Sequence, residues 1–149
     1  MNVVMIGAGY VGLVSGSCFA EFGANVTCVD NENSKIEKLN AGIMPIYEPG
    51  LEDLVQRNVK AGRLKFTTEL KSVIEQADLV FLAVGTPTRR GDGHADLKYV
   101  FAAAEEIAAH LKGYTVIVDK STVPVGTARQ VSRIIKEANP SADFDVVSN

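Results

Sequence analysis

The chain has 149 residues, of which 46% are hydrophobic and 22% are charged, and this composition is typical of a globular protein and excludes disordered and fibrous classes. Fifteen Lys and Arg against eighteen Asp and Glu give a net charge of −3, which argues against nucleic acid or an anionic membrane as the main partner. No apolar run approaches the roughly 20 residues that a membrane-spanning helix needs. The N-terminus lacks a signal peptide, and Cys18 and Cys28 have no metal-type spacing, so we expect a cytoplasmic protein without a metal site.

Short apolar strands alternate with amphipathic helices along the chain. The predicted strands are 3–6, 26–29, 64–68, 79–84, 114–118 and 144–147. The predicted helices are 11–22, 34–42, a stretch around 51–55, a long helix capped by Asp96 and ended by Gly113, and 126–138. Strands separated by helices must pair in parallel through crossovers. Two halves of three strands each predict an α/β fold with a doubly wound six-stranded parallel sheet, the Rossmann-type dinucleotide-binding plan.

A glycine motif, G-x-G-x-x-G, follows the first predicted strand and opens the first predicted helix at Gly7, Gly9 and Gly12. In this context the motif predicts a dinucleotide site. We expect Gly7 to permit a tight turn, Gly9 to leave room for a pyrophosphate, and Gly12 to let the helix pack closely on the strand. The free amides and the dipole at the helix N-terminus would then attract the phosphates.

An acidic residue completes this motif, because Asp30 ends the second strand 18 residues after Gly12. A carboxylate at this place accepts hydrogen bonds from ribose hydroxyls and repels a 2′-phosphate. The expected cofactor is therefore NAD rather than NADP. The structural alternative is an ordinary tight turn followed by a solvated strand end.

Two loops follow strands that end at the same edge of the sheet, namely 85–93 after the fourth strand and 119–127 after the fifth. Each loop carries a hydroxyl just past its strand, where the hydroxyl could bond the ribose or the amide of the cofactor. The same residues are also common caps and turn formers. Position alone does not separate these two interpretations.

Four segments carry a family resemblance: 7–13 (GAGYVGL), 48–51 (EPGL), 84–87 (VGTP) and 120–127 (KSTVPVGT). In order and spacing they resemble the UDP-glucose/GDP-mannose dehydrogenase family over the whole chain, and 120–127 is most similar to UDP-glucose 6-dehydrogenases. The resemblance implies an NAD-dependent oxidation of a nucleotide sugar, UDP-glucose to UDP-glucuronate with two NAD, as in polysaccharide precursor synthesis. It also implies that the full-length enzyme is a homodimer.

The resemblance implies roles for individual residues. Tyr10 and Val11 would contact the cofactor phosphates through backbone amides, and Lys35 would help Asp30 hold the adenosine ribose. Without the family, Lys35 is an ordinary solvated residue in the first turn of a helix.

Two threonines receive roles in the same way. Thr86 would contact the nicotinamide-side ribose, and Thr122 would lie near the reacting carbon as an accessory catalytic residue. The nucleophilic cysteine of the family lies in a later segment that this chain does not contain, because Cys18 and Cys28 fall in a helix and a strand, where we expect small buried hydrophobic side chains. We therefore interpret 1–149 as an NAD-binding domain without the central helix and the C-terminal catalytic domain, and we expect it to be inactive alone.

Two other functions stay open. The chain could belong to a GDP-mannose or UDP-N-acetylmannosamine 6-dehydrogenase, or it could be a non-catalytic NAD-sensing module of similar fold and length. The two hydroxyl-bearing loops favour a dehydrogenase, since a sensor has no need of them at the nicotinamide end.

Overall fold

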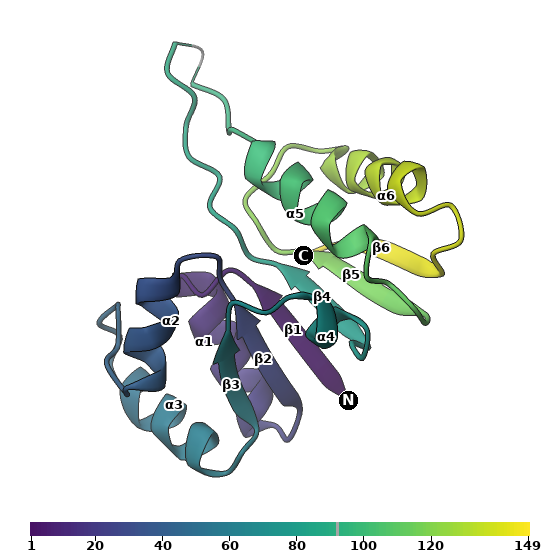
Figure 1. Cartoon of the computed structure of the whole chain (residues 1–149). Helices are drawn as coiled ribbons and strands as arrows, with labels where there is room; N and C mark the ends of the chain where they lie inside the picture. Colours follow the sequence, from purple (N-terminus) through teal and green to yellow (C-terminus); the bar gives the residue numbers. More distant parts are fainter. Residues whose placement is uncertain (92) are drawn as a thin grey trace.

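The computed structural model describes residues 1–91 and 93–149. Its six strands form one parallel sheet in the order β3-β2-β1-β4-β5-β6, which confirms the predicted doubly wound fold (Figure 1). The strands are β1 (Asn2–Ile6), β2 (Asn25–Val29), β3 (Leu64–Thr67), β4 (Leu79–Leu82), β5 (Thr115–Asp119) and β6 (Phe144–Ser148). The helices are α1 (Tyr10–Glu21), α2 (Asn33–Asn40), α3 (Leu51–Lys60), α4 (Lys71–Ile74), α5 (Lys98–Ala108) and α6 (Thr127–Ala138).

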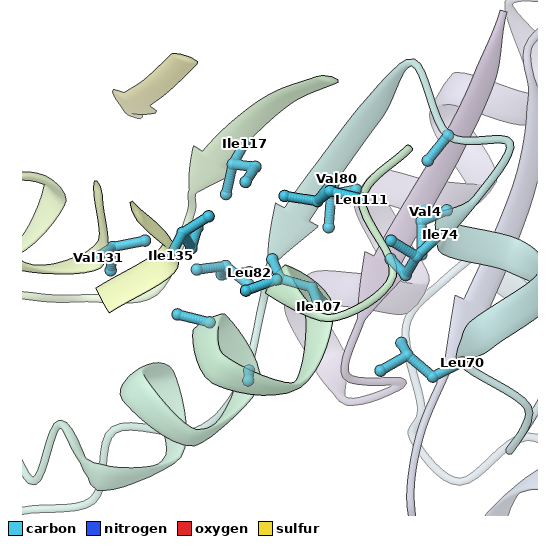
Figure 2. Close-up of a cluster of buried hydrophobic side chains, with 14 of the residues drawn as sticks. Val4, Leu70, Ile74, Val80, Leu82, Ile107, Leu111, Ile117, Val131 and Ile135 are labelled. Atoms are coloured by element: carbon cyan, nitrogen blue, oxygen red, sulfur yellow. The ribbon is translucent and has the colours of Figure 1, made fainter. Parts of the chain in front are cut away.

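The sheet buries both of its faces at the central strand. Val3, Val4 and Met5 of β1 are all buried, because consecutive side chains point to opposite faces and each face is covered by helices. Val3 and Met5 belong to a core built with α1, α2 and α3. Val4 belongs to a second core built with α4, α5 and α6, in which Ile107, Leu82 and Ile135 lie together (Figure 2). A run of apolar residues that does not alternate with polar ones is therefore what the sequence of a strand buried on both faces shows.

The ends of several elements differ from the prediction. The helix α5 begins after Leu97 rather than at a cap on Asp96, although the Asp96 carboxylate accepts the Lys98 amide at 3.1 Å. It ends at Ala108, well before Gly113. The short helix α4 was not predicted, since four residues carry too little periodicity to detect. Gly23 does terminate α1 with a φ of +100°, as expected of a glycine just beyond a helix.

The predicted burial of the two cysteines is half right. Cys28 is buried in β2, and Cys18 is exposed on α1. The prediction for Cys18 is wrong because the buried positions of α1 are Gly12, Leu13, Gly16, Ser17 and Ala20, and position 18 lies on the other side of the helix. An apolar-looking helix does not bury every apolar residue that it contains.

The carboxyl ends of β1, β2, β4 and β5 meet at one edge of the sheet, as parallel pairing requires. The chain passes from β1 to β2 and β3 on one side of β1, and then returns to place β4 on the other side. The strand order therefore reverses between β1 and β4. In this fold class, ligands bind outside the carboxyl ends at such a reversal. The parts of the β4–α5 connection that the structure describes, 83–91 and 93–97, leave this edge and extend away from the sheet (Figure 1).

Candidate functional site

The glycine loop joins β1 to α1 in a single tight turn. Gly7 has a φ of +105°, which favours glycine, and its amide donates to the Val29 carbonyl at 2.7 Å. The first hydrogen bond of α1 runs from the Leu13 amide to the Gly9 carbonyl. The amides of Tyr10 and Val11 therefore precede the first intrahelical bond and can donate to an acceptor from outside the helix.

The three glycines of the loop differ in what surrounds them. A Cβ at Gly12 would lie 1.9 Å from the Gly7 carbonyl oxygen, and one at Gly7 would lie 2.6 Å from the Ala83 carbonyl oxygen. Both positions are thus filled by backbone. A Cβ at Gly9 would meet nothing within 4 Å. Two glycines serve the packing of the turn, and the space beside the third is open, as a site for a close-lying phosphate requires.

Asp30 follows β2 and reaches back to the glycine loop. Its Oδ2 accepts the Ala8 amide at 2.8 Å and the Lys35 Nζ at 3.0 Å, and its Oδ1 accepts the Glu32 amide at 3.0 Å. The Asp30 side chain is 9% exposed and that of Lys35 is 24% exposed. The structure therefore links the acidic end of β2, the turn after β1 and the first turn of α2 in one network.

The charges of this network support each other. Burial alone would raise the pKa of Asp30, but the amides of Ala8 and Glu32 and the ammonium group of Lys35 outweigh it and lower the pKa. Partial burial would lower the pKa of Lys35, but the hydrogen bond and the charge of Asp30 raise it. Lys35 also lies 3.4 Å from the Glu32 carboxylate. Two carboxylates thus face one ammonium group, and the cluster keeps a net negative charge.

A cavity of about 550 Å³ opens beside the glycine loop and the Asp30 network. Gly7, Gly9, Asp30 and Lys35 line one side of it. The other side comes from the end of β4 and from α5, through residues that include Val84, Gly85, Tyr99, Ala103 and Glu106. The predicted loop and acidic residue therefore share one cavity at the expected edge of the sheet.

A second cavity, of about 580 Å³, lies over β1, β2, β3 and α4. Its lining includes Thr27, Lys65, Thr67 and Ser72 but none of the residues of the glycine loop. Among its described lining residues none is a buried polar or charged side chain, and the helix that contributes to them, α4, has four residues. The first cavity is therefore the candidate site.

The two threonines lie farther along the same edge. Thr86 is half-buried after β4, and Thr122 is exposed after β5. Neither is among the described residues that line the first cavity. Ser121, which directly precedes Thr122, is buried, and its Oγ lies 2.9 Å from the Val84 carbonyl oxygen. The hydroxyls of the two loops thus differ, because that of Ser121 is turned inward and that of Thr122 is accessible.

Several residues of the site were not predicted. Tyr99 and Glu106 of α5 line the cavity, and Ala102 and Ala103 lie between them with helical spacing, so a pattern of one helix face could have indicated them. Glu32 offers no motif that singles it out. The Tyr10 hydroxyl donates to the Glu48 carboxylate at 2.9 Å, a contact across 38 residues that no local pattern predicts.

Neither cysteine lines the cavity. Burial raises the pKa of Cys28 to about 12, and the negative charge of Asp30 contributes, so this thiol stays protonated at neutral pH. Among the described residues, no three His, Cys, Asp or Glu side chains gather closely enough to hold a metal ion. Within the same residues, no helix has the length and apolar character needed to cross a bilayer.

A parallel sheet in this order, with a glycine turn opening α1 and an acid ending β2, defines a dinucleotide-binding domain. A model of the UDP-glucose/GDP-mannose dehydrogenase family, NAD binding domain, matches residues 1–149. The chain belongs to this family, and its cofactor is NAD.

Relatives and solved structures agree with this assignment. A UDP-glucose 6-dehydrogenase of Rhizobium meliloti (strain 1021) is 64% identical over the whole chain, which covers 34% of that protein. The crystal structure of a ternary complex of GDP-mannose dehydrogenase from Pseudomonas aeruginosa matches all of the chain with a TM-score of 0.94 at 35% identity, and the match covers 36% of it. A UDP-glucose dehydrogenase from Pyrobaculum islandicum matches 99% of the chain with a TM-score of 0.91 at 40% identity, and the match covers 35% of that structure. The chain thus spans about a third of the length of these proteins.

Proposed function

We propose that residues 1–149 form the cofactor-binding domain of a UDP-glucose 6-dehydrogenase, and that the whole enzyme converts UDP-glucose to UDP-glucuronate with two NAD. The observation that carries the proposal is the open space at Gly9, which lies in one cavity with the Asp30 carboxylate. The sugar is inferred from identity, since a UDP-glucose 6-dehydrogenase is 64% identical and, among the solved structures, a UDP-glucose dehydrogenase at 40% exceeds a GDP-mannose dehydrogenase at 35%.

In this proposal the pyrophosphate lies against the turn that contains Gly7, Gly9 and Gly12. The amides of Tyr10 and Val11 donate to its oxygens, and the N-terminus of α1 adds the attraction of the helix dipole. The fit rests on the space at Gly9, where any larger side chain would occupy the place of the phosphate.

The adenosine ribose lies against Asp30. An ionised carboxylate offers about four acceptor positions, and Ala8, Glu32 and Lys35 use three of them. One position, on Oδ1, is left for a ribose hydroxyl. A 2′-phosphate would meet the two carboxylates of Asp30 and Glu32 with only Lys35 to balance them, which explains a preference for NAD over NADP.

The nicotinamide half extends toward the loops after β4 and β5. Bound NAD would supply a hydride acceptor, and Thr86 and Thr122 would position its nicotinamide half, Thr86 at the ribose and Thr122 near the reacting carbon. The catalytic thiol is supplied by a part of the enzyme outside this chain, because Cys28 is buried and protonated and Cys18 lies away from the cavity. The whole enzyme is proposed to be a cytoplasmic homodimer that binds neither nucleic acid nor membranes.

The test is a calorimetric titration of the chain with NAD and with NADP. We expect NAD to bind about tenfold or more tightly than NADP, from charge repulsion alone. Asp30→Ala should narrow this ratio, whereas Asp53→Ala, which removes an exposed carboxylate from the first turn of α3, should leave it unchanged. A preference for NADP would overturn the proposal. The chain with UDP-glucose and NAD should also form no NADH at steady state, and steady formation would show that the catalytic groups lie within residues 1–149.

A further inference from the structure

Ser121 connects the ends of two neighbouring strands. It lies two residues beyond β5 and is 9% exposed. Its Oγ lies 2.9 Å from the Val84 carbonyl oxygen and 3.2 Å from the Leu82 carbonyl oxygen. A serine hydroxyl has one proton, so it donates to these two carbonyls in alternation or as a shared hydrogen bond.

This contact lies beyond the backbone ladder. The pairing of β4 with β5 ends at Leu82 and Asp119, and the Lys120 amide adds a last hydrogen bond to Leu82. The Ser121 hydroxyl extends the connection two residues farther along the β4 side, to Val84. Beyond this contact the two segments separate, one into the loop with Thr86 and the other into the loop with Thr122.

We propose that Ser121 is a positioning residue for the nicotinamide half of NAD. Its hydroxyl fixes the separation of the two loops, and with it the separation of Thr86 and Thr122, without touching the cofactor itself. This inference rests on the proposed function, because it assumes that the nicotinamide half lies along those loops. The adenosine half is held by the glycine loop and Asp30, which have no hydrogen bond to Ser121 among those of the described residues.

A purely structural role makes a different prediction. If Ser121 only stabilised the fold, its loss would lower the stability of the chain and leave the relative affinities of different ligands unchanged. If Ser121 positions the two loops, its loss weakens ligands that reach them and spares ligands that do not. ADP contains the adenosine and the pyrophosphate of NAD but lacks the nicotinamide ribose and ring, so a comparison of NAD with ADP separates the two roles.

The experiment titrates the chain and its variants with NAD and with ADP by calorimetry. In Ser121→Ala we expect the NAD affinity to fall about three- to tenfold, the range for one lost hydrogen bond, and the ADP affinity to stay within about twofold. Ser17→Ala is the matched control, because Ser17 is fully buried in α1 and its Oγ has no hydrogen-bond partner among the described residues. It should change neither affinity.

Three results would overturn the proposal. The first is that Ser121→Ala loses affinity for NAD and for ADP equally, and the second is that it loses affinity for neither. The third is that the unaltered chain binds NAD and ADP with equal affinity, because the two loops would then contribute nothing to binding. Failure of the unaltered chain to bind either ligand would instead refute the proposed function. If Ser121→Ala does not fold, Ser121→Cys carries the test, since a thiol has a similar size and donates only weakly, and the same selective loss of NAD affinity is expected.

Discussion

Replacement of Gly9 by Ala separates binding from folding in this domain. Gly9 has a φ of −82° and a ψ of −166°, an extended conformation that alanine adopts freely, and its Cβ would meet no atom within 4 Å. Alanine stabilises the fold by about 0.4–1 kcal/mol because it has less conformational freedom than glycine in the unfolded chain, while it is a poorer N-cap than glycine by about 1 kcal/mol. The free energy of unfolding should therefore change by less than about 1 kcal/mol.

The effect of Gly9→Ala on NAD should be much larger. The added methyl group occupies the place of the pyrophosphate and removes at least one hydrogen bond between an amide and a charged oxygen. Such a bond contributes about 1.5–3 kcal/mol, which corresponds to a loss in affinity of about tenfold to a hundredfold or more.

The substitution Gly12→Ala should act mainly on the stability of the domain. Its Cβ would lie 1.9 Å from the Gly7 carbonyl oxygen, and a separation of 3.0 Å requires the backbone to move by 3.0 − 1.9 = 1.1 Å. Because the turn is packed against Ala83, this movement should cost about 1–3 kcal/mol or more in stability. The loss of NAD binding would then follow from distortion of the turn.

Urea denaturation and NAD calorimetry on the two variants check these expectations. If Gly9→Ala binds NAD as tightly as the unaltered chain, the pyrophosphate does not lie beside Gly9. If Gly12→Ala is as stable as the unaltered chain, the packing of the turn does not require glycine.

Three further predictions concern charged groups. Asp119 is 1% exposed and neither carboxylate oxygen has a hydrogen-bond partner among the described residues; burial raises its pKa, and the nearby Ser121 amide opposes this only in part. The native state therefore binds the proton more tightly than the unfolded state does, and the stability contribution of Asp119 falls as the pH rises from about 3.8 through the native pKa. In urea titrations, the stability of Asp119→Asn minus that of the unaltered chain should be larger at pH 7 than at pH 3. Equal differences at both pH values would contradict this. Asp30 has a lowered pKa, so its contribution to stability is present above about pH 3.8 and is lost as the pH falls through the native pKa. Asp30→Asn should be less stable than the unaltered chain at pH 7, and this deficit in stability should shrink toward pH 2. A deficit that does not depend on pH would show that the Asp30 carboxylate is not stabilised in the fold. Lys35→Met should raise the pKa of Asp30, measured by NMR titration of the carboxyl carbon, and an unchanged pKa would show that the ion pair has no effect in solution.

The fold could be predicted because the strands buried on both faces, such as 3–6, appear as continuous apolar runs. The elements that escaped prediction are those without a periodic signal. The four residues of α4 complete little more than one turn, and α5 ends at Ala108 although the buried Leu111 continues the helical spacing from Ile107. The exposure of Cys18 depended on the direction in which α1 faces the sheet, which composition does not specify.

The residues of the candidate site whose position could be predicted are those that follow a strand. Gly7, Gly9, Gly12 and Asp30 follow strands that end at one edge, and the topology brings them together. Contacts between side chains from distant segments could not be predicted in the same way. The hydrogen bond from Tyr10 to Glu48, the carboxylate of Glu32 beside Lys35, and the inward hydroxyl of Ser121 all depend on three-dimensional packing.

The most direct test of the central claim is a two-dimensional NMR correlation spectrum of backbone amides during titration of the chain with NAD. The account predicts the largest shifts at the amides of Ala8, Gly9, Tyr10 and Val11 and at those that follow Asp30. Shifts concentrated instead at Thr27, Lys65 and Ser72, around the cavity over β1, β2, β3 and α4, would contradict it.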